Sequence, residues 1–318
     1  MCKSNIISNK KKILSAGASN LDTLAQLPTA CNNSNLKKRA RSKWYGNKVI
    51  APLLFIDSPL HKQYQRAYYC NSTLLQRGQT ITGKYCNSRI CHICNRIRTA
   101  KFLNGYGEPL KKLGNLEFIT LTVPNCKGDD LSRTITSMTK SFTNILRVIR
   151  ERRKIKISGI KKVEVTYNEV ENTFHPHLHI ICDKGVGGCI VVEWLNRYTK
   201  ATVKAQKVQT ADAKSFNELF KYSTKILQKV GKGIDIYIPA IDIIMRALDR
   251  RRTFQTFGKI KKVSEDVQEL QSITDTTIEN IEIQEWNYDD LRHDWYTLDG
   301  VKALTGYIPP DIQFTIFV

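Results

Sequence analysis

Three of the six histidines in this chain lie within five positions, in the segment NTFHPHLHII at residues 172–181. In an extended strand, alternate side chains point to the same face, so His175, His177 and His179 share one face. Such a row is either a solvent-facing cluster of imidazoles or a set of metal ligands, because neutral imidazole binds many divalent metals. The side chains on the neighbouring strand favour one of these interpretations.

The segment before the histidines has the form of the first strand of a hairpin. GIKKVEVTYN at 159–168 alternates apolar and polar residues, and the polar run NEVEN at 168–172 predicts the turn. A turn centred near residues 170–171 places Glu164 directly opposite His177. Two imidazoles and a carboxylate from adjacent strands favour a divalent-metal site with open coordination positions for a substrate. The ligand set is compatible with catalytic Zn²⁺ and equally with Mn²⁺ or Mg²⁺.

Four of the nine cysteines fall in a single short segment, residues 70–94. They are Cys70, Cys86, Cys91 and Cys94. Thiolates at such spacings are typical of a tetrahedral structural Zn²⁺ site, in which the C-x2-C pair at 91 and 94 forms one half. Cys70 is the most distant ligand in sequence, and His92 is the alternative for its position. Free cysteines that happen to cluster are the other interpretation.

A third group with chemical potential lies in SFNELFKYSTKILQKV at 215–230, whose apolar residues recur at helical spacing. On another face of the expected helix, Glu218, Tyr222 and Lys225 follow one another at intervals of four and three residues. A nucleophilic tyrosine needs metal or cationic help, because the pKa of phenol is near 10, and a lysine one turn on supplies it. A glutamate one turn earlier can take a proton from water. An ordinary surface helix has the same spacing.

Regular elements that position these groups are visible in the same pattern. LEFITLTV at 116–123 alternates as a half-buried strand does, and apolar residues between 131 and 153 recur at helical spacing. A further helix is expected around 192–204 and a short strand near 206–210.

The charge of the chain is large and uneven. Its net charge is +21, and residues 263–318 hold 12 acidic and 2 basic residues, which leaves 48 basic and 17 acidic residues in 1–262. Such a body favours a polyanionic partner, or else a merely solvated surface. Nucleic acid fits better than a membrane, because no basic amphipathic helix with a bulky apolar face accompanies the charge.

No segment predicts a membrane protein. The longest apolar run, VIAPLLFI at 49–56, is too short to span a bilayer and contains a proline. The first residues, MCKSNIISNKKKIL, lack the apolar core of a secretory signal, so we expect a cytoplasmic protein. Residues 1–45 are polar and basic without sustained periodicity, which predicts a mobile arm.

The order of the motifs is similar to that of a known family. FITLTVPN, VEVTYN, HPHLH and ELFKYSTK, after CNSRICHICN, resemble the rolling-circle replication initiators of bacterial plasmids, within the HUH endonuclease superfamily. The resemblance covers about residues 68–260. It implies an α+β, ferredoxin-like catalytic domain, whose antiparallel sheet carries the metal-binding pair on a central strand, together with a small zinc-binding segment.

The resemblance also implies roles for single residues. His177 and His179 match the histidine ligands, and Glu164 matches the acidic third ligand. Tyr222 matches the nucleophile that attacks a DNA phosphodiester, Lys225 matches its following lysine, and Glu218 fits the glutamate used for the terminating hydrolysis. His175 belongs to the same motif as an outer group.

The position of the tyrosine indicates the subclass. Ile226 stands where two-tyrosine initiators have a second tyrosine, which favours the single-tyrosine class. Relaxases carry their tyrosine ahead of the histidine motif, so the order here differs from theirs.

The expected function is therefore nicking and rejoining of a plasmid origin through a 5′-phosphotyrosyl intermediate, with a host helicase and DNA polymerase as partners. A single-tyrosine transposase of the same superfamily and a non-catalytic zinc-bearing DNA-binding repressor are the alternatives. We expect a basic, flexible region at 1–62, a zinc-binding segment at 63–105, the catalytic domain at 106–262 and an acidic region at 263–318.

Overall fold

The computed structural model describes residues 33–221, 228–230, 233–264, 266–267 and 283–318. Its largest sheet has five strands in the order β6-β3-β5-β4-β9, and all neighbouring pairs are antiparallel. The strands are β3 (Leu116–Thr122), β4 (Gly159–Asn168), β5 (Thr173–Asp183), β6 (Lys207–Thr210) and β9 (Phe254–Phe257).

Two helices connect these strands in a βαββαβ order. Helix α5 (Gly128–Arg153) joins β3 to β4, and helix α6 (Gly187–Arg197) joins β5 to β6, followed by the short 3-10 turn η2 (Val203–Ala205). The strand order of this unit, β6-β3-β5-β4, is the ferredoxin-like arrangement, to which β9 is added beside β4. The predicted α+β fold with an antiparallel sheet is confirmed.

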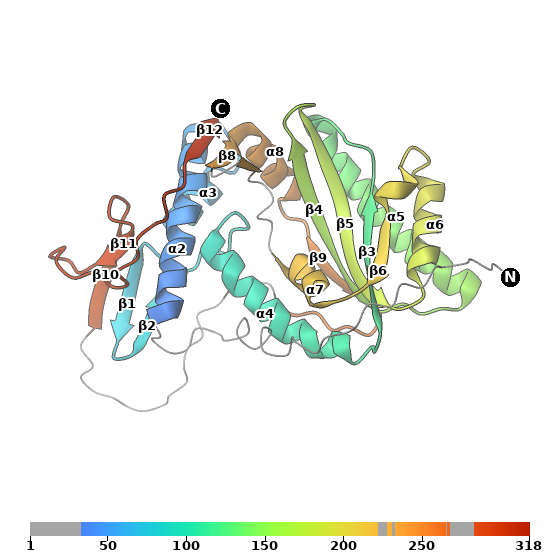
Figure 1. Cartoon of the computed structure of the whole chain (residues 1–318), viewed down its shortest axis with the longest axis horizontal. Helices are drawn as coiled ribbons and strands as arrows, with labels where there is room; N and C mark the ends of the chain where they lie inside the picture. Colours follow the sequence, from blue (N-terminus) through green and yellow to red (C-terminus); the bar gives the residue numbers. More distant parts are fainter. Residues whose placement is uncertain (1–32, 222–227, 231–232, 265, 268–282) are drawn as a thin grey trace.

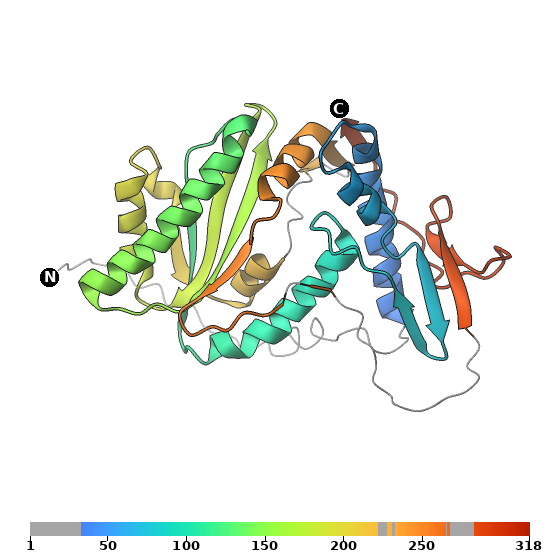
Figure 2. The ribbon, with the colours of Figure 1, turned by 180° about the vertical axis from the view of Figure 1, so that it is seen from behind.

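Helices α5 and α6 cover one face of the sheet, as the views from both sides show (Figure 1 and Figure 2). Apolar residues of α5 at intervals of three and four pack against the apolar side of β3 and β5. The residues of α5 are Leu131, Ile135, Met138, Phe142, Ile145 and Ile149. Acidic residues in the first turn and arginines in the last turn oppose the helix dipole, and Lys154 ends the helix in the left-handed region. The predicted helix is confirmed and begins three residues earlier than residue 131.

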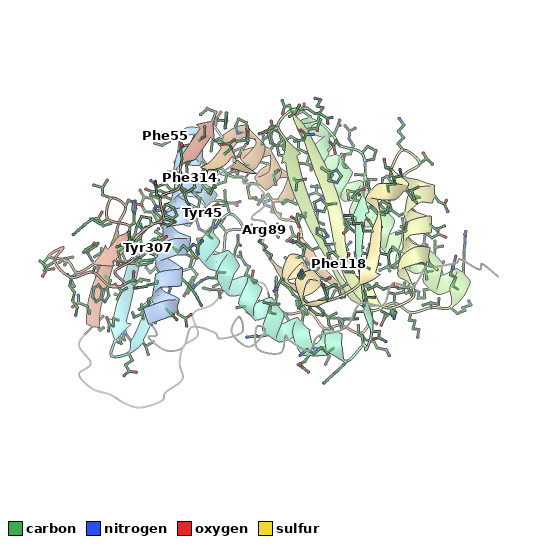
Figure 3. The ribbon with its side chains drawn as sticks, viewed as in Figure 1. Tyr45, Phe55, Arg89, Phe118, Tyr307 and Phe314 are labelled. Carbon is green, nitrogen blue, oxygen red and sulfur yellow. The ribbon has the colours of Figure 1, made fainter. Side chains whose placement is uncertain are left out.

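The opposite face of the sheet carries α4 (His92–Lys111) and α7 (Ala213–Phe220). Aromatic residues of both helices pack on Phe118 of β3, labelled in Figure 3, and on Ile160 and Ile181 of the two central strands. Helix α7 begins at a capping box in which Asp212 accepts a hydrogen bond from the backbone of Ser215. This is the face on which the histidines of β5 lie.

The single helix predicted over 215–230 is wrong at Lys221 and at residues 228–230, the described residues that follow Phe220. Helix α7 ends at Phe220, and the next residue, Lys221, has an extended backbone with φ −61° and ψ 114°. Residues Gln228–Val230 form strand β7, because they pair with β8 (Gly233–Tyr237), which also pairs in parallel with β12 (Phe314–Phe317). Tyr222 and Lys225 lie outside the described residues.

The cysteine segment and the acidic C-terminal region form one sheet. Its order is β11-β10-β1-β2, and it joins β1 (Thr73–Arg77) and β2 (Thr80–Gly83) to β10 (Ile283–Asp289) and β11 (Asp294–Tyr296). Trp286 and Trp295 of the C-terminal strands are buried against Leu74 of β1. Strands β10 and β11 of the acidic region are therefore an integral part of this sheet, whereas β12 belongs to the sheet of β7 and β8.

The described part of the basic N-terminal region, residues 33–62, contains helices. Helix α2 (Asn33–Ile50) continues into the 3-10 turn η1 (Ala51–Phe55) and α3 (His61–Tyr68). Tyr45 of α2 packs against Phe314 of β12, and both are labelled in Figure 3. Hydrophobic periodicity is weak because α2 also buries polar groups: Lys43 donates to Ser72, and Asn47 donates to Asp290.

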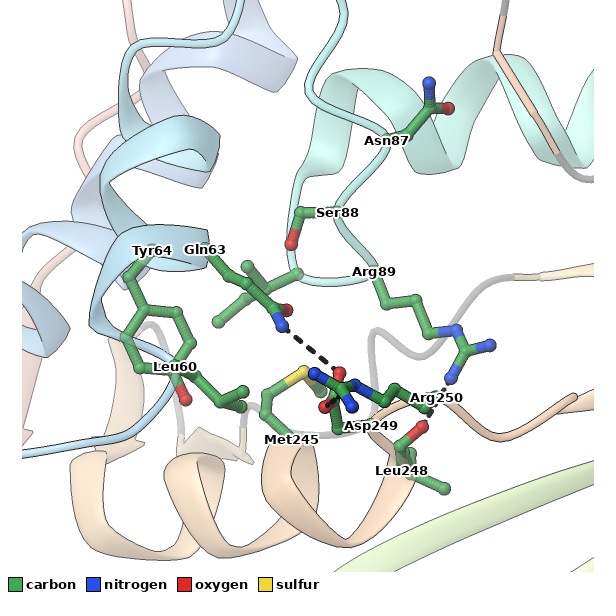
Figure 4. Close-up of a pocket in the computed structure, with 11 residues that line it drawn as sticks. Leu60, Gln63, Tyr64, Asn87, Ser88, Arg89, Met245, Leu248, Asp249 and Arg250 are labelled. Carbon is green, nitrogen blue, oxygen red and sulfur yellow. Dashed lines mark hydrogen bonds and ion pairs between the residues drawn. The ribbon is translucent and has the colours of Figure 1, made fainter.

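The cysteine segment contacts the C-terminal end of α8 (Ile238–Leu248), the helix that precedes β9. A pocket of about 250 Å³ lies between them (Figure 4). Gln63 donates to Asp249 at 3.1 Å across this pocket, and Arg89 donates to the carbonyl of Leu248. Within the described residues, no helix has both the length and the apolar character needed to cross a bilayer.

Candidate functional site

The hairpin of β4 and β5 brings Glu164, His177 and His179 together. The register pairs Glu164 directly with His177, as predicted, so that both side chains point to the face covered by α4 and α7. The Oε2 atom of Glu164 lies 4.0 Å from Nε2 of His177 and 3.4 Å from Nε2 of His179. These three ligand atoms lie within 4.8 Å of one another, and all three residues are buried. Their spacing suits coordination of one ion.

Hydrogen bonds to neighbouring groups set the orientation of the two imidazole rings. Nδ1 of His177 lies 3.1 Å from the carbonyl of His175, and since a carbonyl only accepts, Nδ1 carries the proton and Nε2 keeps its lone pair. Nδ1 of His179 lies 3.2 Å from the hydroxyl of Thr120 on β3, and its ring stacks on Phe118 at 5.3 Å. Such partners orient the rings of metal-binding histidines.

The electrostatics of the cluster favour a bound cation. Burial lowers the pKa of His177 to about 4, so its imidazole is neutral near pH 7. Within the described residues, the buried Nε2 of His179 makes no hydrogen bond. A buried nitrogen and a buried carboxylate that face each other without a hydrogen bond are unfavourable unless a cation lies between them. The donor set of two nitrogens and one carboxylate fits a divalent ion with open positions.

A buried lysine, which the sequence analysis did not single out, completes this group. Lys162 lies opposite His179 in the register, and its Nζ is 3.1 Å from Oε2 of Glu164. The register that places Glu164 opposite His177 also places Lys162 opposite His179, so the signal was present in the sequence. The sequence pattern did not indicate a role for this lysine, because lysine is not an expected metal ligand.

The predicted tyrosine group is placed only in part. Glu218 lies on α7, and its Oε1 is 3.9 Å from Nε2 of His179, so this carboxylate faces the metal cluster. Tyr222 and Lys225 lie outside the described residues. Helix α7, which carries Glu218, ends at Phe220, and Lys221 has an extended backbone.

His175 lies at the outer edge of the site. Its ring is 5.5 Å from that of His177, and its Nδ1 lies 2.8 Å from the side-chain oxygen of Asn125. The backbone of His175, rather than its ring, meets the cluster, through the hydrogen bond from His177.

The four cysteines form a second cluster. Their sulfurs lie within 4.8 Å of one another. The sulfur of Cys94 is 3.8 Å from that of Cys70 and 3.7 Å from that of Cys86, and all four thiols are free. A disulfide needs sulfurs about 2 Å apart, whereas a tetrahedral Zn²⁺ with bonds of about 2.3 Å separates its sulfurs by about 3.8 Å. The spacing therefore fits four thiolates around one ion.

Surrounding groups also fit thiolate ligands. The backbone N–H of Cys86 donates to the sulfur of Cys70, and that of Ser88 donates to the sulfur of Cys86, both at 3.4 Å. Hydrogen bonding with Cys70 raises the pKa of the Cys91 thiol, because the protonated thiol is the form that donates to the neighbouring sulfur. His92 is not part of this cluster, and its ring lies 5.1 Å from the ring of Tyr45.

Comparisons with known proteins connect both clusters to one family. Residues 77–182 match the family described as replication protein. Over this segment, the chain is similar to that family. The matched segment includes the hairpin bearing Glu164 and the two histidines, together with three of the four clustered cysteines.

The curated relatives of the chain share one name, Protein rep. The chain is 31% identical to one from Streptococcus pneumoniae serotype 2 over 43% of its own length, and 27% identical to one from Staphylococcus aureus over 48%. The matches span 47% of the first relative and 74% of the second, so the chain covers about half the length of the first. No solved structure matches the chain. The predicted resemblance to replication initiators is confirmed, and the single-tyrosine subclass stays a prediction.

Proposed function

We propose that the chain is a plasmid rolling-circle replication initiator of the HUH type, which nicks one strand of a double-strand origin and later rejoins it. One observation carries the proposal: Glu164, His177 and His179 form a buried cluster that can hold a metal ion, and it lies within the segment that matches the replication protein family. The name of the relatives supports replication rather than transposition.

The residues of the cluster have distinct tasks in this proposal. A bound Mn²⁺ or Mg²⁺ ion supplies a Lewis acid for the scissile phosphate. Glu164 and the two imidazoles hold the ion, and the carbonyl of His175 keeps His177 in the tautomer that presents Nε2. The face of the sheet that surrounds them is apolar and aromatic, which limits access of water and strengthens charge interactions.

Tyr222 is the proposed nucleophile. Its phenolic oxygen attacks the phosphorus, the bond to the 3′ oxygen breaks, and the strand leaves with a free 3′-hydroxyl that takes up a proton and primes synthesis. The 5′ phosphate stays esterified to the tyrosine. Because one phosphodiester is exchanged for another, the bond energy is kept for rejoining. Lys225 stabilises the charge that develops at phosphate.

Glu218 is the proposed base for termination by hydrolysis. Its carboxylate faces His179 from α7, one third exposed, so water reaches it. It takes a proton from the water that attacks the phosphotyrosyl bond. The four cysteines hold a structural Zn²⁺ that stabilises the junction of α2, α4 and β1.

DNA is the proposed partner, bound through the basic body of residues 1–262, and the target strand reaches the site as a single-stranded or extruded segment. A host helicase and polymerase act on the nicked product. We also propose residues 106–262 as the catalytic domain.

The proposal is tested with the full chain, manganese and supercoiled DNA that carries the origin of its own replicon. The wild type should release open circles and carry DNA on its tyrosine. Tyr222→Phe should lose both activities and keep its DNA affinity, because only one oxygen is removed. Tyr198→Phe is the matched control, because its hydroxyl bonds Ser137 and Ser141 on α5.

A covalent adduct in Tyr222→Phe would show that another tyrosine is the nucleophile. A wild type that binds the origin and never nicks it supports the non-catalytic DNA-binding alternative.

A further inference from the structure

Lys162 is buried at the centre of the site without being a metal ligand. It is 2% exposed, and lysine is almost never fully buried unless its charge is paired. Its ammonium has three hydrogens to donate. The structure supplies three acceptors: Oε2 of Glu164 at 3.1 Å, the carbonyl of Glu218 at 3.2 Å and the carbonyl of Lys221 at 2.6 Å.

The two carbonyls belong to the C-terminal end of α7. Carbonyls in the last turn of a helix have no partner within the helix, and the helix dipole makes this end attractive to a cation. Helix α7 has only eight residues and packs through Leu219 and Phe220, and Thr99 of α4 donates to the carbonyl of Phe220 at 3.1 Å. Lys162 connects this end to β4, and through Glu164 to both histidines.

We propose that Lys162 is a positioning residue, which fastens the C-terminal end of α7 to the metal ligand Glu164. The inference rests on the proposed function, because the residue that follows Lys221 in the chain is Tyr222, the proposed nucleophile. The carbonyl that Lys162 holds most closely is part of the peptide bond to that residue. The lysine thus fixes the point at which the nucleophile's segment leaves the helix.

The charge of Lys162 argues against the simpler role of assisting metal binding. A positive charge 3.1 Å from a ligand oxygen repels a divalent ion and makes that oxygen a poorer donor. A neutral residue at this position therefore binds metal more tightly. Removal of the charge has two effects of opposite sign, tighter metal binding and slower nicking, whereas general damage to the site weakens both.

The experiment uses Lys162→Met, which keeps an unbranched side chain of nearly the same length and removes its charge and donors. Mn²⁺ affinity of the DNA-free full chain is measured by electron paramagnetic resonance at pH 7. We expect affinity to rise by about tenfold. Nicking of supercoiled origin DNA should fall by about 100-fold, as expected when a reacting group loses its position.

A third measurement does not depend on nicking. Amide hydrogen exchange over residues 213–221 should speed up in Lys162→Met, because the end of α7 loses two hydrogen bonds, while exchange in the β4-β5 hairpin stays slow. If the wild type does not nick DNA, the proposed function fails, and the exchange and affinity data still decide the role of Lys162.

Lys161→Met is the matched control. Lys161 is the adjacent residue on the opposite face of β4, equally buried, with its Nζ 3.5 Å from the carbonyl of Thr139 on α5. Its replacement deletes an equally buried lysine side chain from the same strand, and it should leave Mn²⁺ affinity, nicking and the exchange of α7 unchanged.

A second variant guards against loss of folding. Lys162→Gln removes the charge and keeps amide donors, so it should fold, bind Mn²⁺ more tightly and retain part of the protection of α7. Weaker or unchanged Mn²⁺ affinity in the folded variants overturns the proposal, as does wild-type exchange of residues 213–221 in Lys162→Met. Lys162 is then a structural partner of Glu164 alone.

Discussion

The two clusters of candidate metal ligands are assembled in different ways. The cysteine ligands come from irregular positions: Cys70 follows α3, Cys86 follows β2, and the last two lie at the start of α4. The glutamate and histidines lie on two adjacent strands whose register alone sets their separation. We therefore expect that an ion is needed to fix the loops of the first cluster, whereas the hydrogen bonds of the hairpin hold the second.

The clusters also differ in how complete they are. Four sulfurs about one tetrahedral edge apart leave no position for a substrate, and such closed sites are structural. Three ligands leave coordination positions open on a bound ion, which is the form expected of a catalytic site. The comparison teaches that the first cluster should govern folding and the second should govern chemistry. The following predictions test that division, beginning with the largest effect.

Loss of one clustered cysteine should have the largest effect. Cys94→Ser removes a ligand at the first turn of α4, so we expect zinc to be lost and unfolding free energy to fall by as much as about 10 kcal/mol, the scale of structural zinc binding. Metal analysis and denaturant unfolding measure both quantities. Cys189→Ser, outside both clusters, should keep its zinc and stability. Equal zinc content in the two variants contradicts the structural assignment.

Loss of a histidine ligand should instead reduce activity strongly and stability only slightly. His179→Ala should lower nicking by about 1,000-fold, the scale of losing an electrostatic catalyst, with zinc content unchanged. Because His179 is buried and stacks on Phe118, the cavity should also cost about 1–2 kcal/mol of stability. Nicking assays and denaturant unfolding separate these effects. Full activity in this variant at ordinary manganese concentrations removes the metal role.

The sequence predicted the hairpin well because its physics is local. A strand has a period of two, and a short polar turn leaves little freedom in register, so the alternation of residues alone places Glu164 opposite His177. The same rule holds Lys162 opposite His179. What the pattern could not reveal is that this lysine reaches a helix that follows it by more than 50 residues.

Other elements depend on distant partners and were mispredicted. The helical period continues past Phe220, but the pairing of 228–230 with β8 overrides it, as tertiary contacts override weak local preference. Helix α2 was not predicted, because its inner face carries polar residues such as Lys43 and Asn47. The hydrogen-bond partners of these residues lie in the cysteine and acidic segments. Hydrophobic periodicity cannot detect a helix that is buried through hydrogen bonds.

The cluster of Glu164, His177 and His179 should also affect how the stability of the protein depends on pH. Burial lowers the pKa of His177 from its ordinary value of 6.5 to about 4, so the unfolded chain binds one more proton than the folded chain between these values. The contribution of His177 to stability is therefore present above pH 6.5 and is lost as pH falls toward 4.

Denaturant unfolding of the wild type and His177→Gln measures this contribution. Between pH 7 and 5 the wild type should lose about 2 kcal/mol more than the variant, since each pH unit below 6.5 corresponds to about 1.4 kcal/mol. The cysteine cluster is common to both proteins and cancels in the difference. Parallel pH profiles show that His177 titrates normally in the folded protein.

The smallest effect on cleavage should come from Glu218, which faces the open cluster without belonging to it. Its Oε1 lies 3.9 Å from Nε2 of His179, and Glu164 is the closer carboxylate at 3.4 Å. The first displacement consumes no water, so Glu218→Ala should nick origin DNA within a few-fold of the wild type and should accumulate the covalent adduct. Release of DNA at termination should fail, because no carboxylate accepts the proton of the attacking water. Time courses of nicking and of adduct decay separate the two steps, and Glu218→Gln, which keeps the shape and removes the base, should behave like the alanine variant. Normal adduct decay in both variants assigns termination to another group and leaves the metal role of the three ligands intact.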